Sequence, residues 1–382
     1  MQINKLMEQV REAEPRLRAR LRELVEIESP SDDRDAVNRA ADLVIDWARE
    51  LGVEVRRHPG GSFGDVVELR FGASGDRKPV LMLGHLDTVY SMGTIATMPW
   101  REVKAEDGVR LMGPGVVDMK AGVVMALEAI AALRDLNALN RPVILLLNPD
   151  EEVGSEVSRP HTERLARESD AVFVLEPAQG LAYKTARKGV GHFELTVCGV
   201  AAHAGVDFAS GHSAVLEMAR LVEEVSGWTD PSKGRTVNVG VITGGTRSNV
   251  IAGQCKAEVD VRVVTMEDAA RVEEMFRALR THDPACKLRV DGGINRPPME
   301  RSAGTVKLFQ QAQRLAAEIG LDLQEAATGG GSDGNFTAAI GVPTLDGMGA
   351  VGGGAHSPGE YVVAGHLVQR TALLAGMLQS EL

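Results

Sequence analysis

The chain has 382 residues, 44% of them hydrophobic and 25% charged, which are values of a globular protein long enough for two or three ordinary domains. Its formal net charge of -11 argues against a nucleic-acid partner, because binding a phosphate backbone requires a basic surface. No stretch approaches the roughly 20 consecutive apolar residues that a membrane-spanning helix needs, so the sequence predicts no membrane partner either.

The start of the chain and its cysteines predict a cytoplasmic protein. Residues 1–29 are charged and amphipathic, without the apolar core of a secretory signal. Cys198, Cys255 and Cys286 are far apart and form no Cys-x-x-Cys pair, which argues against a disulfide framework and against a thiolate zinc site. This cysteine usage fits a reducing compartment, in which the three residues serve as small apolar side chains.

Helices and strands alternate over the first half of the chain. Pro15 predicts the start of a helix that reaches Ile27, and a second helix is expected at 35–51. The elements expected after them are strands at 53–57, 66–71 and 79–83, a helix at 123–136, and strands at 142–147 and 170–175. This order predicts an α/β layer with a largely parallel sheet.

The pattern changes near Lys188. Residues 192–197 alternate apolar and polar side chains, as a half-exposed strand does. The elements expected next are a helix at 214–225, strands at 237–243 and 257–264, a helix at 267–279 and a strand at 287–291. This order is typical of a small α+β domain of the ferredoxin-like kind. Because α/β elements resume afterwards, we expect a domain inserted at 188–297 between two parts of a larger domain, 1–187 and 298–382.

His85 and Asp87 follow the apolar run 79–83. In an extended backbone, residues two apart point to the same side, so both side chains can face one site. An imidazole beside a carboxylate is common at metal sites, because the second group can fix the tautomer of the first. The alternative is a strand end with two solvated polar residues, and the remainder of the chain has to decide between the two.

Four more polar clusters follow predicted strands or lie in glycine-rich turns, where α/β sheets build their sites. The residues concerned are Asp118 ahead of a helix, Glu151 and Glu152 after the strand at 142–147, Glu176 after the strand at 170–175, and His356 after a glycine run. Each residue taken singly also fits a helix cap, a solvated loop or a surface position. Their joint occurrence favours a common site.

Two imidazoles and three carboxylates are available as ligands: His85, Asp118, Glu152, Glu176 and His356. If Asp118 bridges, each of two metal ions receives one histidine, one terminal carboxylate and the shared carboxylate, with room left for water. Two ions about 3.5–4 Å apart can activate a bridging water and polarise a carbonyl. Glu151 is adjacent to a ligand and is not needed as one, which makes it the natural general base.

The motifs together resemble the co-catalytic di-zinc exopeptidase and deacylase family over essentially the whole chain. The segments that carry the resemblance are Gly84-His85-Leu86-Asp87-Thr88-Val89, Gly113-Pro114-Gly115 with Asp118-Met119-Lys120-Ala121-Gly122, Asp150-Glu151-Glu152-Val153-Gly154-Ser155, Leu175-Glu176-Pro177 and His356-Ser357-Pro358. The resemblance implies one zinc on His85, Asp118 and Glu176. It implies a second zinc on Asp118, Glu152 and His356.

The same resemblance implies roles for the neighbours of these ligands. Glu151 would act as the base and later as the proton donor, and Asp87 would orient His85. A cis peptide bond is implied after Asp118.

The inserted domain resembles the lid and dimerisation domain of the same family. His203, in Gly199-Val200-Ala201-Ala202-His203-Ala204-Gly205, corresponds to a histidine that reaches the partner subunit's active site and stabilises the tetrahedral oxyanion. Asn249, in Ser248-Asn249-Val250-Ile251, matches a substrate-contacting asparagine. Arg262, in Asp260-Val261-Arg262, matches an arginine that binds the substrate's free carboxylate, although an exposed strand residue is the alternative. Arg296 is a further candidate, for an acidic side chain.

The glycine-rich turn at 328–335 looks most like the glutamate carboxypeptidase (carboxypeptidase G) branch of the family. Its triple glycine, which includes Gly330 and Gly331, would let backbone N–H groups approach a carboxylate closely. The resemblance implies hydrolysis of a peptide or N-acyl amide bond that releases a C-terminal amino acid, with glutamate or another acidic residue favoured. The desuccinylase branch carries a similar Ser-Asp-Gly segment, so an N-acyl amino acid deacylase, such as a desuccinylase or deacetylase, stays the alternative.

The resemblance thus predicts an α/β, three-layer zinc-exopeptidase catalytic domain with an inserted α+β, ferredoxin-like lid and dimerisation domain, working as a homodimer. Its expected cofactors are two zinc ions, and nitrogen and oxygen ligands also suit cobalt or manganese. Its expected substrate is a small peptide or N-acyl amino acid. A different class, a non-catalytic metal-binding scaffold, would require a lost ligand or base, and Glu151, Asp87 and the five candidate ligands are all present.

Overall fold

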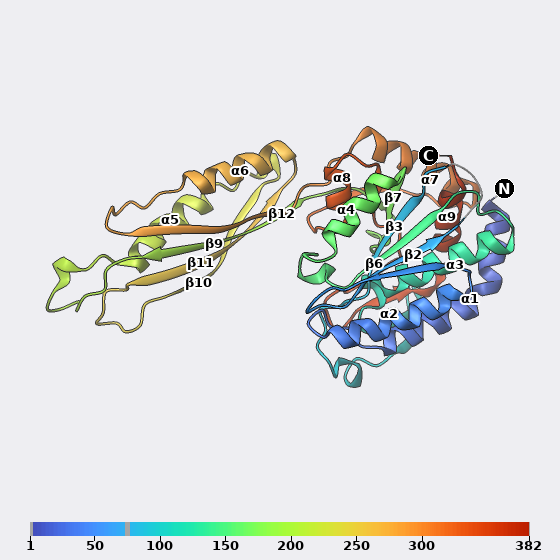
Figure 1. The fold of residues 1–382 in the computed structure, drawn as a ribbon, viewed down its shortest axis with the longest axis horizontal. Helices are drawn as coiled ribbons and strands as arrows, with labels where there is room; N and C mark the ends of the chain where they lie inside the picture. The colour runs from blue at the N-terminus through green and yellow to red at the C-terminus, as the bar shows by residue number, and fades with distance from the viewer. Residues whose placement is uncertain (1–2, 73–76, 382) are drawn as a thin grey trace. The chain divides into compact units, whose positions relative to one another are not determined.

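The chain folds into two compact units (Figure 1). The computed structural model describes residues 3–72 and 77–381. The first unit consists of Met1–Ala186, Arg301–Ala327 and Ser332–Leu382, and the second consists of Arg187–Glu300 and Thr328–Gly331. The second unit therefore interrupts the first in the sequence.

A six-stranded sheet forms the centre of the first unit, in the order β1-β2-β6-β3-β7-β14. Its strands are β1 Glu54–His58, β2 Val66–Phe71, β3 Val80–His85, β6 Val143–Asn148, β7 Ala171–Val174 and β14 Thr344–Leu345. Strands β6, β3, β7 and β14 run parallel to one another, whereas β2 pairs antiparallel with both β1 and β6. The prediction of an α/β layer with a largely parallel sheet is confirmed.

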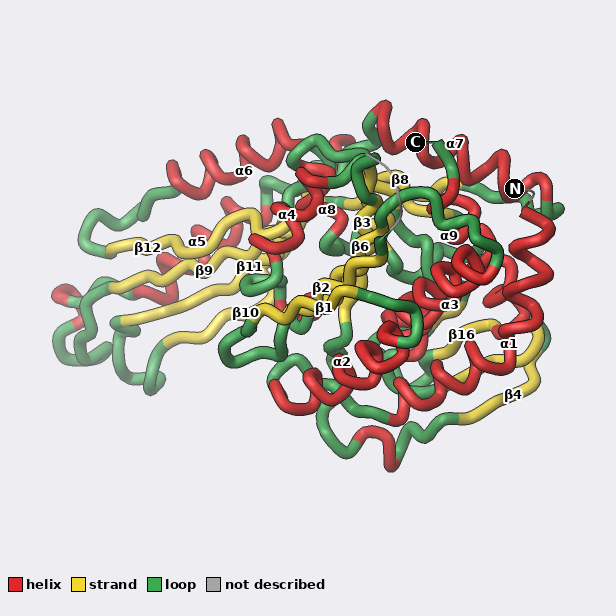
Figure 2. The backbone as a smooth tube through the Cα atoms, turned by 45° about the vertical axis from the view of Figure 1, so that its right-hand side comes forward, coloured by secondary structure: helices red, strands yellow, loops and turns green. Residues whose placement is uncertain are grey.

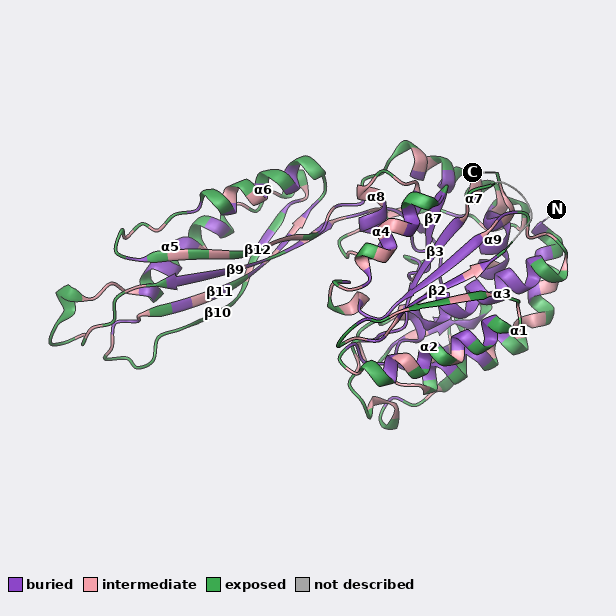
Figure 3. Ribbon diagram, viewed as in Figure 1, coloured by how far each residue is buried: buried purple, intermediate pink, exposed green. Residues whose placement is uncertain are grey.

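Helices cover both faces of this sheet, so the first unit has three layers (Figure 1). The α-helices are α1 Ile3–Glu26, α2 Arg34–Arg49, α3 Ala121–Asp135, α4 Arg159–Glu168, α7 Ala303–Glu318, α8 Gly334–Ala339 and α9 Leu367–Gln379. Along β3, Val80 and Met82 join the core beneath α1, α3 and α9, while Leu81 and Leu83 join the smaller core beneath α4. Successive side chains of a strand point to opposite faces, so a strand that is buried at every position supplies both cores (Figure 3).

Helix α1 begins well before the position predicted from Pro15, and that prediction is wrong. Ile3, Leu6 and Val10 are fully buried on one face of the helix and pack in the same core as α9. Proline inside a helix costs about 3 kcal/mol. Burial of three large apolar side chains, at about 1.5–3 kcal/mol each, outweighs this cost.

Among the described residues, no helix combines the length and the apolar character needed to cross a membrane.

Short strands that the sequence pattern does not predict form two further sheets. One has the order β15-β16-β5-β4 and consists of β4 Arg101–Ala105, β5 Gly108–Met112, β15 Gly352–Gly353 and β16 Tyr361–Val363 (Figure 2). The other pairs β8 Tyr183–Arg187 with β13 Glu325–Thr328. In the first of these sheets β16 pairs with β5, with Tyr361 opposite Met112. The turn after β5 therefore lies beside the loop that precedes β16.

The second unit contains a four-stranded antiparallel sheet in the order β10-β11-β9-β12. Its elements in chain order are β9 Gly189–Cys198, α5 Ala214–Ser226, β10 Thr236–Gly244, β11 Gln254–Val263, α6 Met266–Ala278 and β12 Lys287–Arg296. One core joins Leu195 of β9 and Val259 of β11 to Leu221 of α5 and Phe276 of α6, so both helices cover the same face of the sheet. The ferredoxin-like arrangement predicted from the order of elements is confirmed.

Glu68, on β2, gives the first unit a pH-dependent contribution to stability. Its side chain is fully buried and contacts Arg70, the Arg164 guanidinium at 2.9 Å and the His58 ring at 3.2 Å. Burial alone would raise the pKa of Glu68, but the bonds to these cationic partners outweigh it and lower the pKa to about 2.

A carboxyl whose pKa is lower in the folded chain than in the unfolded chain adds stability above the unfolded value. We expect this contribution to be lost as the pH falls from about 4.5 to about 2. Glu68→Gln should flatten the dependence of the free energy of unfolding on pH in that window, as measured by urea denaturation. Glu54→Gln, at an exposed glutamate of the neighbouring strand β1, is the control and should leave the slope unchanged. An unchanged slope in Glu68→Gln would contradict the assignment.

Candidate metal centre

Three neighbouring parallel strands place acidic and histidine side chains at one edge of the central sheet. Strand β3 lies between β6 and β7 and ends with His85. Glu151 and Glu152 lie in a short 3-10 turn just after β6, and Glu176 lies two residues beyond β7. Because the carboxyl ends of parallel strands meet at the same edge, segments far apart in the sequence converge here.

Asp118 and His356 reach this edge from the other elements of the first unit. Asp118 lies between β5 and the start of α3, and the peptide bond after it is cis, as the family resemblance implies. His356 lies in the loop between β15 and β16 and has a φ of 61° in the left-handed region. The pairing of β16 with β5 brings this loop to the turn that holds Asp118.

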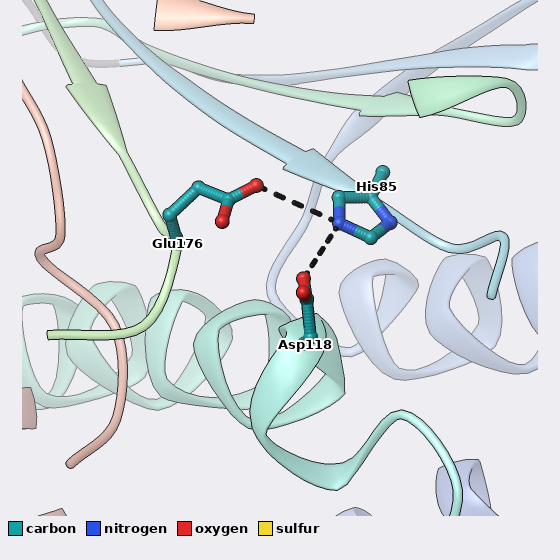
Figure 4. Close-up of side chains that lie close together, drawn as sticks. All are labelled: His85, Asp118 and Glu176. Atoms are coloured by element: carbon teal, nitrogen blue, oxygen red, sulfur yellow. Dashed lines mark hydrogen bonds and ion pairs between the residues drawn. The ribbon is translucent and has the colours of Figure 1, made fainter. Parts of the chain in front are cut away.

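The structure brings the five predicted ligands together in two groups that share Asp118. In the first, Nε2 of His85 lies 3.1 Å from Oδ1 of Asp118 and 3.7 Å from Oε1 of Glu176 (Figure 4). In the second, Nε2 of His356 lies 3.3 Å from Oδ2 of Asp118 and 3.1 Å from Oε2 of Glu152. Within each group the ligand atoms all lie within 4.8 Å of one another.

These spacings fit metal ions. Ligands about 2.1 Å from a tetrahedral ion lie about 3.4 Å from one another, close to the separations seen here. The two carboxylate oxygens of Asp118 face different histidines, as a bridging ligand requires. The donors are imidazole nitrogens and carboxylate oxygens, a set that suits zinc and similar ions. The residues therefore can hold two ions.

The carboxylates of this cluster favour positive charge on the two imidazoles. Burial lowers the pKa of His85, but bonds to Asp118 and Asp87 outweigh it and hold the pKa well above its ordinary value. The bonds to Asp118 and Glu152 raise the pKa of His356 to about 10. Burial raises the pKa of Asp118, but the two imidazoles outweigh it and lower the pKa. An ion that binds here displaces the imidazole protons, so binding strengthens as the pH rises.

Asp87 connects the candidate ligands to one another. Nδ1 of His85 lies 2.9 Å from the Asp87 carbonyl oxygen and 3.4 Å from its carboxylate, so the backbone is the closer partner of the ring. Donation by Nδ1 leaves Nε2 free to bind a metal. The Asp87 carboxylate itself accepts from the backbone N–H groups of Glu151 and Glu152, both at 3.1 Å. Ser31, which the sequence pattern did not single out, donates its hydroxyl to the same carboxylate at 2.7 Å.

Two glycines fit closely around the carbonyl of Leu175, just before Glu176. A Cβ added to Gly122 of α3 would lie 2.2 Å from the Leu175 carbonyl oxygen, and one added to Gly349 would lie 2.1 Å from it. The N–H of Gly349 donates to the Glu176 carbonyl at 2.9 Å. These close approaches set the position from which the Glu176 side chain starts. The need for glycine at these two positions cannot be recognised from a single sequence, because it depends on how closely the folded backbone approaches Leu175.

Six other predicted residues lie in the second unit, where they form two separate groups. His203 and Asn249 lie on adjacent segments, joined by the N–H of Ala204, which donates to the Asn249 carbonyl at 3.0 Å. Both side chains are exposed, and Nδ1 of His203 accepts from the N–H groups of Gly205 and Val206 at 3.1 Å.

The second group surrounds the glycine turn. Arg262 makes a two-pronged bond to Asp260, with both N–O distances 2.9 Å, and a longer one of 3.5 Å to the Gly329 carbonyl. Arg296 is buried, and its side chain would contact a Cβ added at Gly331. The carbonyls of Gly330 and Gly331 accept from the buried Arg187, which the sequence reading missed.

The sequence of this chain is similar to those of known metal-dependent peptidases. Residues 81–380 match the model of "Peptidase family M20/M25/M40", and the chain belongs to this family of metallopeptidases and related hydrolases.

Among characterised proteins, carboxypeptidase G2 of Pseudomonas sp. (strain RS-16) is 29% identical over 384 residues, which cover 98% of this chain and 91% of the relative. Acetylornithine deacetylase of Myxococcus xanthus is 27% identical over 334 residues, or 81% of this chain and 82% of the relative. Among solved structures, the YXEP protein of Bacillus subtilis, described as a dinuclear metal binding peptidase from the M20 family, superimposes with a TM-score of 0.70 at 17% identity and covers 97% of this chain and 98% of its own.

Proposed function

We propose that this chain is a two-metal hydrolase that cleaves a peptide or N-acyl amide bond and releases a C-terminal amino acid, with glutamate or another acidic residue favoured. The observation that carries this proposal is the pair of ligand groups sharing Asp118, one completed by His85 and Glu176 and the other by Glu152 and His356. The proposed ions are zinc, with cobalt or manganese as substitutes. When bound, the pair would polarise the substrate carbonyl and lower the pKa of a water.

Glu151 is the proposed general base. Its backbone N–H donates to the Asp87 carboxylate at 3.1 Å, as does that of the neighbouring Glu152. Glu151 is not a member of either ligand group, so its carboxylate can take a proton from the attacking water and pass it to the leaving nitrogen. The adjacent Glu152 serves as a ligand, which separates the two roles.

Selection of the substrate is assigned to the second unit. Arg262 is proposed to bind the free α-carboxylate, with Gly330, Gly331 and Arg296 near an acidic side chain. The bond from Arg262 to Asp260 supports a preorganised guanidinium, whose orientation is set before a substrate carboxylate arrives. Asn249 would contact the substrate.

We also propose a cytoplasmic homodimer with a lid and dimerisation domain at 188–297, inserted in a catalytic domain formed by 1–187 and 298–382. In this dimer His203 of the partner subunit would stabilise the oxyanion of the tetrahedral intermediate. Its exposed ring supports the role.

A biosynthetic N-acyl amino acid deacylase is the second candidate. The similarity to an acetylornithine deacetylase favours it, and the same ligand groups and base would serve that reaction. The two candidates differ in the group removed from the amino acid, and they therefore make different predictions for a substrate panel.

The ligand assignment predicts how many ions each variant retains. Wild-type protein dialysed against zinc should hold two ions per chain, as measured by elemental analysis. Asp118→Ala should lose both, because both groups use its carboxylate. His356→Ala should keep the ion assigned to His85 and lose the other. His192→Ala, an exposed histidine of the second unit, is the control and should retain both. Two retained ions in Asp118→Ala would refute the shared ligand.

The base assignment predicts a loss of turnover without a loss of metal. Glu151→Ala should retain its ions while kcat falls by about 100- to 10,000-fold, the usual contribution of a general base. Glu156→Ala, an exposed acid in the same loop, is the matched control and should turn over normally. Turnover near the wild-type rate in Glu151→Ala would show that another group accepts the proton.

A release assay decides between the two candidate functions. The panel contains dipeptides and N-acyl amino acids ending in glutamate, in a neutral residue or in the corresponding α-amide. We expect free α-carboxylates, and glutamate above all, to be preferred, and we expect Arg262→Ala to raise KM for them by about tenfold or more. Equal cleavage of carboxylates and amides would overturn the proposed specificity. A preference for short acyl groups over dipeptides would favour the deacylase.

A further inference from the structure

Glu360 is a fully buried carboxylate that the proposed reaction does not use. It lies at the end of the loop that carries His356, directly before β16. Burying a charge is costly unless hydrogen bonds replace its hydration. The groups that bind Glu360 therefore show what its burial achieves.

Four donors converge on Glu360, and three of them are backbone N–H groups of one turn. Its Oε1 accepts from the N–H of Val117 at 2.8 Å and from the N–H of Asp118 at 3.0 Å. Its Oε2 accepts from the N–H of Gly115 at 2.9 Å. The turn that presents Asp118 thus wraps around this carboxylate, and the amide of Asp118 itself is one of the donors.

The fourth donor is the hydroxyl of Tyr90, 2.7 Å from Oε2 of Glu360. The same phenol oxygen lies 3.0 Å from the carbonyl oxygen of Ser357, the residue after His356. Tyr90 lies shortly after Asp87, in the segment that follows β3 and its last residue, His85. Three segments that supply candidate ligands, those around His85, Asp118 and His356, therefore meet at one buried carboxyl group.

The Asp118 carboxylate can move only a short distance before it stops contacting both histidines. The two oxygens of one carboxylate must face two different histidines, at 3.1 Å and 3.3 Å, so a shift of about 1 Å would bring one oxygen out of reach of its ion. Groups that hold ligands by hydrogen bonds typically contribute about 10- to 100-fold to metal affinity.

We propose that Glu360 is the positioning residue that holds Asp118 in place to bridge two ions, and that Tyr90 links it to the loop of His356. The inference rests on the proposed two-metal function and adds to it two residues that do not contact the ions. Glu360 acts through the backbone of the turn, and Tyr90 acts through Glu360 and the Ser357 carbonyl.

The test compares Glu360→Gln and Tyr90→Phe with wild-type protein, using zinc affinity by competition with a chromophoric chelator. A glutamine accepts with only one terminal atom, so at least one N–H of the turn loses its partner. We expect Glu360→Gln to bind both ions about 10- to 100-fold more weakly, because both groups use Asp118. Tyr90→Phe should weaken mainly the ion assigned to Glu152 and His356.

The control is Glu128→Gln, at a fully buried carboxylate of α3 that bonds Arg16 and Arg20 instead of a ligand turn. It should lower the free energy of unfolding of the metal-free protein and leave zinc affinity unchanged. The visible spectrum of the cobalt-loaded protein gives a second readout, since Glu360→Gln should alter it and Glu128→Gln should not.

Wild-type zinc affinity and an unaltered cobalt spectrum in Glu360→Gln would overturn the inference while leaving the two-metal function intact. A wild-type protein that binds no pair of ions would overturn both. If Glu360→Gln does not fold, Tyr90→Phe decides: selective loss of one ion supports the link, and unchanged binding of both ions refutes it.

Discussion

The shared carboxylate of Asp118 is the interaction on which the rest of the candidate centre depends. Its two oxygens face His85, at the end of β3, and His356, in the loop between β15 and β16. His85 ends a strand of the central sheet, whereas the loop of His356 connects two strands of another sheet of the first unit. The carboxylates of Asp118, Glu152 and Glu176 lie close enough to repel one another unless positive charge lies between them. Hydrogen bonds to these carboxylates raise the pKa values of both imidazoles.

Two buried carboxylates hold the ligand-bearing turns by the same physical means. Asp87 accepts the N–H groups of Glu151 and Glu152, and Glu360 accepts those of the turn that ends in Asp118. Each buried charge is costly, and each is offset by hydrogen bonds from backbone N–H groups. These hydrogen bonds fix the backbone positions from which the candidate ligands Asp118 and Glu152 start.

Elements with strong apolar patterns were predicted well, and those without such patterns were not. The runs that became β3 and β6 are buried at every position, and the polar residues after them stand where parallel strands end. Strand β4 is mostly exposed and β15 has only two residues, so neither produces a periodic signal. Helix α1 begins before the start that Pro15 predicts, because the burial of the residues ahead of it outweighs the local preference of proline.

Local patterns and the order of the motifs are enough to predict the class of fold, the family and the set of candidate ligands. The folded chain adds which oxygen of Asp118 faces which histidine, and that the backbone of Asp87 is the closer partner of the His85 ring. It also adds the hydrogen bonds by which Glu360 and Tyr90 join the loops. The physical reason is that periodicity records burial along a short stretch of chain. Hydrogen bonds between distant segments depend on backbone positions that exist only once the sheets have paired.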